Sequence, residues 1–394
     1  MPIKLTTEKL DYFGRGIAYL DKKIIFIENA LPGEEVLIEI TKEKKSFAEG
    51  KVIDYLTTSP ERVIPKCPYY EECGGCNLSH FKEQLHFKKT EFVSLIKSNC
   101  HLDVNPIVIE SPKNYYYRNK VTLKIENYKW GYYENQSHQF VSINQCLIAK
   151  ESINKIIKRQ DLFKIATGEI VIRSNYNDEI LISINTESKY EVDIEELKKD
   201  NRLLGIIIND KIYYGQDSFI EFIDNYLFKV SINSFFQVNI DILKEIFKIL
   251  SKTNTTNMID LYCGVGVLGT VINKEKLYGI ENSYSSIKDA LLNAKMNKQE
   301  NNYYLLGDSS KISEIKDNID LIIVDPPRSG INKKTMEHIL NLNVGSIIYM
   351  SCNPHTLSRD LKKLKDKYCI KECYLFDMFP QTYHFETICI LTKK

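Results

Sequence analysis

From Ser231 to the C-terminus, short apolar runs that are typical of strands alternate with segments that are typical of helices. The expected strands cover residues 258–262, 277–281, 303–306, 321–325, 347–351, 373–378 and 386–392. Residues 241–250 have the spacing of an amphipathic helix. Strands that alternate with helices usually pair in parallel, so this pattern predicts a doubly wound α/β sheet of seven strands. The last two strands follow each other directly, which predicts a reversed terminal hairpin.

Two of these expected strands end in residues with distinctive chemistry. Asp325-Pro-Pro-Arg328 follows one apolar run, and Cys352, in Ser351-Cys-Asn-Pro354, follows the next. Ligands of open α/β sheets bind at the carboxyl ends of the strands, so we expect Asp325 and Cys352 at one edge. A carboxylate, a rigid proline loop and a thiol at that edge suggest covalent chemistry. Taken alone, however, a single cysteine is more often a buried structural residue.

A glycine-rich turn indicates a nucleoside site at the same edge. Asp260-Leu-Tyr-Cys-Gly264-Val-Gly266 closes the first strand, and glycines let the backbone approach a ligand closely. Glu281 ends the next strand and could bind both ribose hydroxyls, while Asp308 ends the third and could meet an adenine amino group. A nicotinamide cofactor would also suit this glycine-rich turn followed by acidic residues. Because the Asp-Pro-Pro loop is typical of methyl transfer, the predicted cofactor is S-adenosylmethionine.

The chain of 394 residues is long enough for three domains. Residues 1–57 have the alternation of a small β-barrel, residues 58–230 read as a central α+β domain, and residues 231–394 form the predicted methyltransferase domain. With 53 basic and 52 acidic side chains, overall charge identifies no partner. The stretch from Lys113 to Lys120 interleaves aromatic residues with cations, a pattern that suits single-stranded RNA but also an exposed strand edge. Without an apolar span or signal peptide, we expect a cytoplasmic protein that binds no membrane.

Four of the ten cysteines have the placement of ligands. They are Cys67, Cys73, Cys76 and Cys146. Four thiolates suit either tetrahedral zinc or a [4Fe–4S] cluster, and the spacing alone favours neither. The absence of a secretory signal argues against a disulfide framework.

Several motifs together resemble the RNA uracil-5-methyltransferase family. The matching segments, in chain order, are Ser234-Phe-Phe-Gln-Val-Asn239, Asp260-Leu-Tyr-Cys-Gly264, Asp325-Pro-Pro-Arg328, Ser351-Cys-Asn-Pro354 and Phe376-Asp-Met-Phe-Pro-Gln-Thr-Tyr-His-Phe-Glu386. The N-terminal β-module resembles a TRAM domain, so the likeness covers nearly the whole chain. Amino-group methyltransferases usually carry Asn-Pro-Pro-aromatic, and cytosine-5 enzymes carry a cysteine after the Asp-x-Pro pair, so uracil is the favoured base.

The resemblance implies roles for individual residues. Cys352 would add to C6 of uracil and Glu386 would remove the proton from C5, while His384 would either orient the base or be structural. The residues implied for the cofactor and base pocket are Gln237, Tyr262, Glu281, Asp308 and Asp325. The family likeness also favours a [4Fe–4S] cluster on the four cysteines, as a brace or a redox sensor.

The implied substrate is RNA, and the TRAM domain with the cysteine set resembles the branch that modifies 23S ribosomal RNA. Methylation of the transfer RNA T-loop is the alternative. A non-catalytic RNA-binding assembly factor and an iron–sulfur redox sensor are rival functions from other classes. We expect a monomer.

Overall fold

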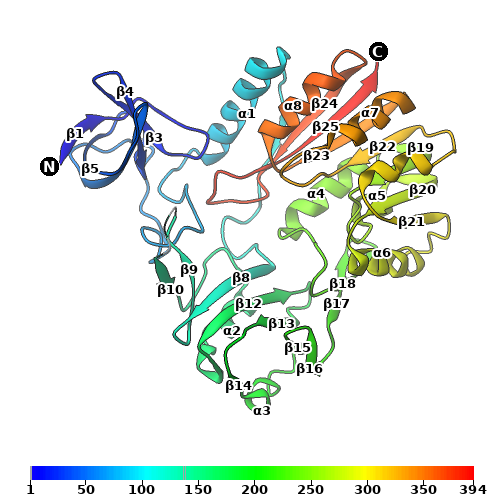
Figure 1. Cartoon of the computed structure of the whole chain (residues 1–394), viewed down its shortest axis with the longest axis horizontal. Helices are drawn as coiled ribbons and strands as arrows, with labels where there is room; N and C mark the ends of the chain where they lie inside the picture. Colours follow the sequence, from blue (N-terminus) through cyan, green and yellow to red (C-terminus); the bar gives the residue numbers. More distant parts are fainter. Residues whose placement is uncertain (1, 136, 138) are drawn as a thin grey trace. The chain divides into compact units, whose positions relative to one another are not determined.

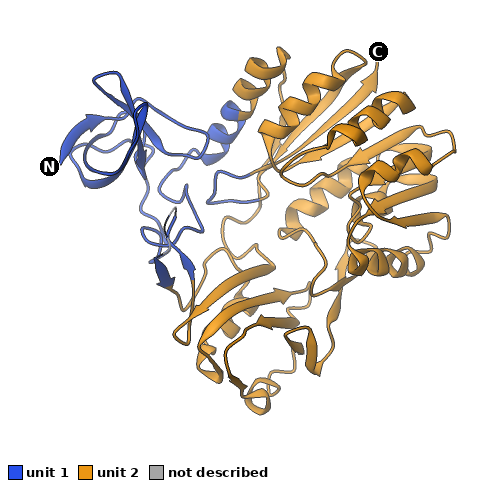
Figure 2. Ribbon diagram, in the orientation of Figure 1, with its two compact units in different colours: residues 1–91, 132–141, 379–384 blue, residues 92–131, 142–378, 385–394 orange. Residues whose placement is uncertain are grey.

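The computed structural model describes residues 2–135, 137 and 139–394, and the chain divides into two compact units (Figure 2). Unit 1 comprises residues 1–91, 132–141 and 379–384, and unit 2 comprises residues 92–131, 142–378 and 385–394. Within the described part of the chain, no helix has both the length and the apolar character that crossing a membrane requires.

The N-terminal part of unit 1 is a six-stranded sheet. Its strands are β1 (Ile3–Thr6), β2 (Lys9–Leu10), β3 (Gly16–Leu20), β4 (Lys23–Glu28), β5 (Glu35–Glu43) and β6 (Phe47–Tyr55), in the order β1-β5-β6-β4-β3-β2. Apolar residues alternate with polar ones along β4 and β5, so Ile25, Ile27, Val36 and Ile38 are buried in one core. The strands expected in this module are therefore confirmed.

The middle of the chain forms a seven-stranded sheet. Its strands are β8 (Lys120–Glu126), β9 (Lys129–Tyr133), β10 (Phe140–Ser142), β12 (Thr167–Ser174), β13 (Ile180–Asn185), β15 (Leu203–Ile208) and β16 (Lys211–Gly215), in the order β10-β9-β8-β12-β13-β15-β16. Two short ribbons accompany it, β11 (Phe163–Ile165) with β14 (Tyr190–Val192) and β17 (Ser218–Ile223) with β18 (Tyr226–Ser231). The helices of this region are α1 (Gln84–Cys100), α2 (Glu151–Ile157), η1 (Gln160–Leu162) and α3 (Ile194–Leu197).

The C-terminal region contains all seven expected strands. They are β19 (Asn254–Leu261), β20 (Asn273–Glu281), β21 (Asn302–Leu306), β22 (Leu321–Val324), β23 (Ser346–Ser351), β24 (Tyr368–Phe376) and β25 (Glu386–Lys393). An eighth strand, β7 (Ile107–Ile109), pairs in parallel with β24, which gives the order β21-β20-β19-β22-β23-β25-β24-β7 (Figure 1). Strand β25 is antiparallel to both of its neighbours, so the expected reversed hairpin is present.

Helices join these strands, and capping residues mark the points at which they begin. They are α4 (Ile240–Leu250), α5 (Val267–Val271), α6 (Tyr284–Met296), η2 (Ser309–Glu314), α7 (Lys333–Leu342) and α8 (Pro354–Leu364). Asn239 caps α4, the expected amphipathic helix, by accepting the backbone N–H of Ile242 at 3.4 Å. Pro354 at the start of α8 has the fixed φ that suits a first helical turn, which directs the chain away from Cys352.

Candidate active site

Three predicted catalytic and pocket residues lie at one edge of the eight-stranded sheet. Strands β22 and β23 are parallel, so Asp325 and Cys352, which directly follow them, lie at the same edge. Strand β25 runs the opposite way, with Thr387 opposite Ser351, which puts its first residue, Glu386, at that edge as well. The topology therefore brings a thiol and two carboxyl groups together from three adjacent strands.

Burial raises the pKa of each of these groups, and repulsion from neighbouring carboxylates adds to the rise for Cys352 and Glu386. Burial, followed by the charges of Glu386 and Asp325, raises the pKa of the Cys352 thiol to about 12, and Arg328 opposes this rise. Burial raises the pKa of Asp325 to about 7. Burial and then Asp325 raise the pKa of Glu386 well above its ordinary value, again opposed by Arg328. Arg328, which the sequence did not assign to the site, is therefore a cation that favours the reactive, ionised forms of both Cys352 and Glu386.

A cavity adjoins these residues in unit 2. Its empty volume, including solvent at its mouth, is about 370 Å³. It is lined by Phe235, Phe236, Gln237, Asp260, Tyr262, Cys263, Gly264, Val265, Val267, Leu268 and Asp325. Three predicted cofactor residues, Gln237, Tyr262 and Asp325, are thus among its walls.

The glycine-rich turn shapes this cavity as the sequence predicted. Gly264 and Gly266 have φ values of 52° and 82°, in the left-handed region that glycine adopts without strain. A Cβ at Gly264 would meet no atom within 4 Å, so the backbone there is open to a ligand. Glu281 supports the turn, since its carboxylate accepts the N–H of Gly264 at 3.1 Å and that of Ser283 at 2.8 Å.

Asp308 lies beyond the cavity lining. It is exposed at the end of β21 and caps η2 by accepting the N–H of Ser310 at 2.9 Å. Hydrogen bonds from the backbone and side chain of Ser310 lower the pKa of Asp308, so it stays ionised. The next residue, Ser309, donates to the Tyr262 hydroxyl at 2.9 Å, which links this turn to a wall of the cavity.

Asp260 is a cavity residue whose part in the site the sequence did not reveal. Its Oδ2 accepts the N–H of Gly269 at 3.1 Å. Its Oδ1 is buried and has no hydrogen-bond partner among the described residues. Burial raises the pKa of Asp260 to about 8 despite the bond from Gly269, with smaller contributions from Asp325 and Glu281. An unpaired buried carboxyl oxygen in the wall of a cavity fits a ligand that carries a hydrogen-bond donor or a positive charge.

The raised pKa of Asp260 predicts that stability falls as pH rises. Because the folded-state pKa of about 8 exceeds the ordinary value of 3.8, the folded chain binds this proton more tightly than the unfolded chain. The resulting stability is complete below about pH 4 and is lost as pH rises through about 8. We expect Asp260→Asn to reduce the fall in Tm between pH 6 and pH 9 by on the order of several degrees, measured calorimetrically without ligand.

Asp320→Asn is the control, since Asp320 also accepts a backbone N–H, that of Asn257 at 3.0 Å, and lies outside the cavity lining. An Asp260→Asn protein with the wild-type dependence of Tm on pH would contradict the prediction.

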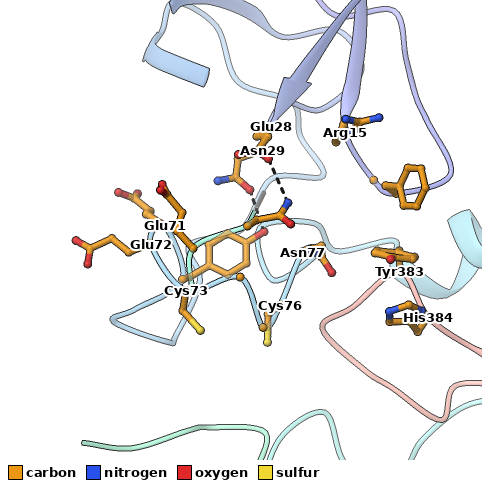
Figure 3. A pocket seen from close by; sticks show the side chains of 17 residues that line it. Arg15, Glu28, Asn29, Glu71, Glu72, Cys73, Cys76, Asn77, Tyr383 and His384 are labelled. Atoms are coloured by element: carbon orange, nitrogen blue, oxygen red, sulfur yellow. Dashed lines mark hydrogen bonds between the residues drawn. The ribbon is translucent and has the colours of Figure 1, made fainter. Parts of the chain in front are cut away.

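The cysteines predicted to bind metal are divided between the two units. Cys67, Cys73 and Cys76 belong to unit 1, and Cys146 belongs to unit 2. Cys73 and Cys76 line a cavity of unit 1 together with Tyr383 and His384 (Figure 3). Across the residues that the structure describes, no three His, Cys, Asp or Glu side chains are grouped as metal ligands. The four thiols have the donor chemistry that a cluster requires.

Comparisons with known proteins agree with these features. Residues 306–394 match the family model described as tRNA (Uracil-5-)-methyltransferase, residues 226–342 match the methyltransferase small domain, and residues 2–53 match the TRAM domain. An uncharacterized RNA methyltransferase of Clostridium tetani is 32% identical over 99% of this chain and 97% of its own length. A second uncharacterized RNA methyltransferase, from Aquifex aeolicus, is 33% identical over 100% of this chain and 99% of its own length.

Among solved structures, the tRNA (uracil-54, C5)-methyltransferase of Pyrococcus abyssi, crystallised with S-adenosyl-L-homocysteine, has the same fold. It is similar with a TM-score of 0.78 and 24% identity, over 99% of this chain and 100% of that one. The full-length sequence relatives, the matched models and the site at the sheet edge lead to one conclusion. This chain belongs to the RNA uracil-5-methyltransferase family and carries an N-terminal TRAM domain.

Proposed function

We propose that this protein methylates C5 of uridine in 23S ribosomal RNA, with S-adenosylmethionine as methyl donor, through a covalent adduct between Cys352 and C6. The observation that carries the proposal is the meeting of Cys352, Glu386 and Asp325 at one sheet edge, beside a cavity lined by Gln237 and Tyr262. These groups match the requirements of the reaction, which needs a nucleophile, a base and a bound methyl donor.

The cavity residues fit the methyl donor. When bound, S-adenosylmethionine supplies a methyl group on a positively charged sulfur. Gln237, Tyr262, Glu281 and Asp325 would hold it, with Asp308 outside the lining as a further contact. The unpaired Oδ1 of Asp260 favours a cation or donor group in this cavity.

Cys352 makes C5 of uracil reactive. Its sulfur forms a bond to C6, and the electrons of the C5–C6 double bond move toward C5 and the C4 carbonyl. C5 would then form a bond to the methyl group as the bond between that group and the donor sulfur breaks, which leaves the electron pair on the sulfur and S-adenosylhomocysteine as the second product. Burial raises the pKa of Cys352 to about 12, so the thiol is protonated before the reaction. It must give this proton to solvent, which reaches the partly exposed side chain, before it attacks. Arg328 favours that loss, because its positive charge stabilises the thiolate.

Glu386 completes the reaction. After methylation, C5 carries both a methyl group and a proton, and the Glu386 carboxylate accepts that proton. The electrons of the C5–H bond reform the C5–C6 double bond, and the C6–S bond breaks to release Cys352 and 5-methyluridine. The second carboxyl oxygen of Glu386, Oε2, is buried and lacks a hydrogen-bond partner among the described residues.

An RNA substrate is supported by the residues beside the cavity. Asn119 donates its backbone N–H to Val238 at 3.0 Å and its side-chain amide to the carbonyl of Gln237 at 3.1 Å. The cation-rich stretch from Lys113 to Lys120 therefore adjoins the cavity wall. Phe235, in the same wall, is 62% exposed. Cations that contact phosphates and an exposed ring that stacks on a base are the usual means of binding single-stranded RNA.

Transfer RNA is the second candidate substrate, favoured by the description of the model that matches residues 306–394. The Pyrococcus abyssi enzyme named for tRNA aligns with the whole chain, so the order of domains does not separate the two substrates. Our preference for 23S rRNA rests on the resemblance of the TRAM domain and cysteine set to the ribosomal branch.

The test is methyl transfer from radiolabelled S-adenosylmethionine to unmodified 23S rRNA and, separately, to unmodified transfer RNA. Label recovered as 5-methyluridine in rRNA supports the proposal. Label recovered only in transfer RNA would support the proposed chemistry and show that transfer RNA, not 23S rRNA, is the substrate. Absence of label in both, with the cofactor bound, favours a non-catalytic RNA-binding factor. Light scattering on the same sample tests the monomer that we propose.

We further propose that Cys67, Cys73, Cys76 and Cys146 hold a [4Fe–4S] cluster, on the strength of four thiol donors and the family resemblance. Protein purified without oxygen should contain about four iron and four sulfide ions per chain. Cys76→Ser should lose most of this iron, whereas Cys369→Ser, at an exposed cysteine of β24, should keep it. Zinc in place of iron, or iron unchanged in Cys76→Ser, contradicts the proposal.

A further inference from the structure

The segment 231–239 forms one wall of the cofactor cavity. Between Ser231, the last residue of β18, and Asn239, the cap of α4, it is neither a helix nor a strand. It lies between β18 and α4 and contributes Phe235, Phe236 and Gln237 to the lining. Backbone bonds tie this segment to the rest of the fold at Ile232, which donates to Asp217, and at Val238, which accepts from Asn119. Between them, residues 234–237 lie outside any sheet or helix, so their position depends on contacts made by side chains from elsewhere.

Asp289, on α6, makes most of these contacts at the start of the segment. It is 0% exposed. Its Oδ2 accepts the N–H of Ser231 and the hydroxyl of Ser234, each at 2.8 Å. Its Oδ1 accepts the Ser231 hydroxyl and the Lys229 ammonium, each at 2.9 Å. A carboxylate that receives four donors is well satisfied, and three of these donors come from the segment itself.

Arg173 holds the same turn from the central sheet. Only 2% of this β12 residue is exposed. Its guanidinium donates to the carbonyl of Ser231 at 3.2 Å and to that of Ser234. Burial lowers the pKa of Arg173 to about 10, and the charge of Asp289 opposes this fall and so stabilises the buried cation. Asp289 thus binds the side chains of this turn, and Arg173 binds its carbonyls.

A separate set of contacts holds the other end of the segment. Besides the bonds from Asn119, the Asn239 amide donates to the Ser111 hydroxyl and to the carbonyl of Met378, each at 3.2 Å. Because Asn119 and Asn239 do not depend on Asp289, removing the Asp289 contacts should displace the residues next to Ser234 while the far end stays in place.

We propose that Asp289 is a positioning residue that, together with Arg173, fixes Phe235, Phe236 and Gln237 in the wall of the cofactor cavity. This inference rests on the proposed function, since it takes S-adenosylmethionine as the ligand of that cavity. Asp289 itself is outside the lining. It acts through Ser231 and Ser234, whose side chains it holds.

The test compares Asp289→Asn and Ser234→Ala with the wild type. The readouts are the Kd of S-adenosylhomocysteine by calorimetry, the KM for S-adenosylmethionine and for RNA, and Tm. Ser234→Ala removes one hydrogen bond to Asp289, and we expect the Kd to rise roughly 5-fold. Asp289→Asn weakens three contacts with the segment, and we expect a rise of roughly 10- to 100-fold. The KM for RNA should rise as well in both, because the exposed ring of Phe235 belongs to the same segment.

Glu34→Gln is the matched control for the loss of a buried carboxylate. Glu34 is also 0% exposed and accepts the N–H of Leu31 at 2.7 Å, that of Ser59 at 3.1 Å and the guanidinium of Arg62. It lies in the N-terminal sheet region of unit 1, so Glu34→Gln should lower Tm and leave the Kd of S-adenosylhomocysteine unchanged.

A Kd within 2-fold of wild type in Ser234→Ala and in any Asp289→Asn protein that folds overturns the inference, whatever happens to Tm. Ser234→Ala keeps the test decisive if Asp289→Asn fails to fold. Failure of the wild type to bind S-adenosylhomocysteine refutes the proposed function instead, and the two failures are therefore distinguishable.

Discussion

Replacing Cys352 by alanine should lower the rate of uridine methylation by about 10⁴-fold or more, the range observed when an enzyme loses its nucleophile. Without the sulfur, C5 of uracil is too weak a nucleophile to take the methyl group. The measurement is single-turnover transfer of labelled methyl groups to the RNA substrate. Cys352 is outside the lining of the cofactor cavity, so the Kd of S-adenosylhomocysteine should stay within about 2-fold of the wild-type value.

Cys369→Ala is the matched control for Cys352→Ala. Cys369 is an exposed cysteine in β24, on the same sheet, and its thiol lies within hydrogen-bond distance of Thr392. The control should retain wild-type rates. Robust methylation by Cys352→Ala would mean that no covalent adduct with this residue is required.

Replacing Glu386 by glutamine should trap the reaction after methyl transfer. The methylated adduct can no longer lose its C5 proton, so Cys352 stays bonded to C6. We expect release of 5-methyluridine to fall by about 10²- to 10⁴-fold, the usual contribution of a general base. A complex of protein and labelled RNA that survives denaturing electrophoresis should accumulate in its place.

The double variant Cys352→Ala/Glu386→Gln checks this assignment, because it should form no stable complex. Glu372→Gln serves as a further control. Glu372 lies on the neighbouring strand β24, where its carboxylate accepts the Tyr374 hydroxyl. If Glu386→Gln turns over like the wild type, or blocks the reaction before the methyl group is transferred, another residue removes the proton.

The strands of the methyltransferase sheet could be predicted from sequence because each is a continuous apolar run between polar turns. Strand β7 could not be predicted in this way. Its three residues follow Pro106, and Ile107 is 53% exposed, so no periodicity marks them. The central sheet was equally hard to order, because β12 pairs with both β8 and β13 and brings residues far apart in the chain together.

The candidate site, too, could be predicted from the sequence only in part. Asp325, Cys352 and Glu386 could be predicted because each lies at a strand end or in a segment with a family likeness. The effect of Arg328 on Cys352 and Glu386 depends on distances between strands, which the sequence does not contain. Asp289 and Arg173 are more than 100 positions apart and meet only through folding. Their burial and partners could be recognised only in three dimensions.

Strand β7 has a consequence for how the chain is made. It leaves the ribosome early, yet its partner β24 follows after roughly 265 residues, or about 13 to 53 seconds of synthesis at 5–20 residues per second. During that interval its parallel pairing cannot form. The sheet that holds Cys352 and Glu386 is therefore completed only after both β24 and β25, which carries Glu386, have been made. Shortened products of interrupted translation would lack this catalytic edge, so a partial chain should not react with the RNA.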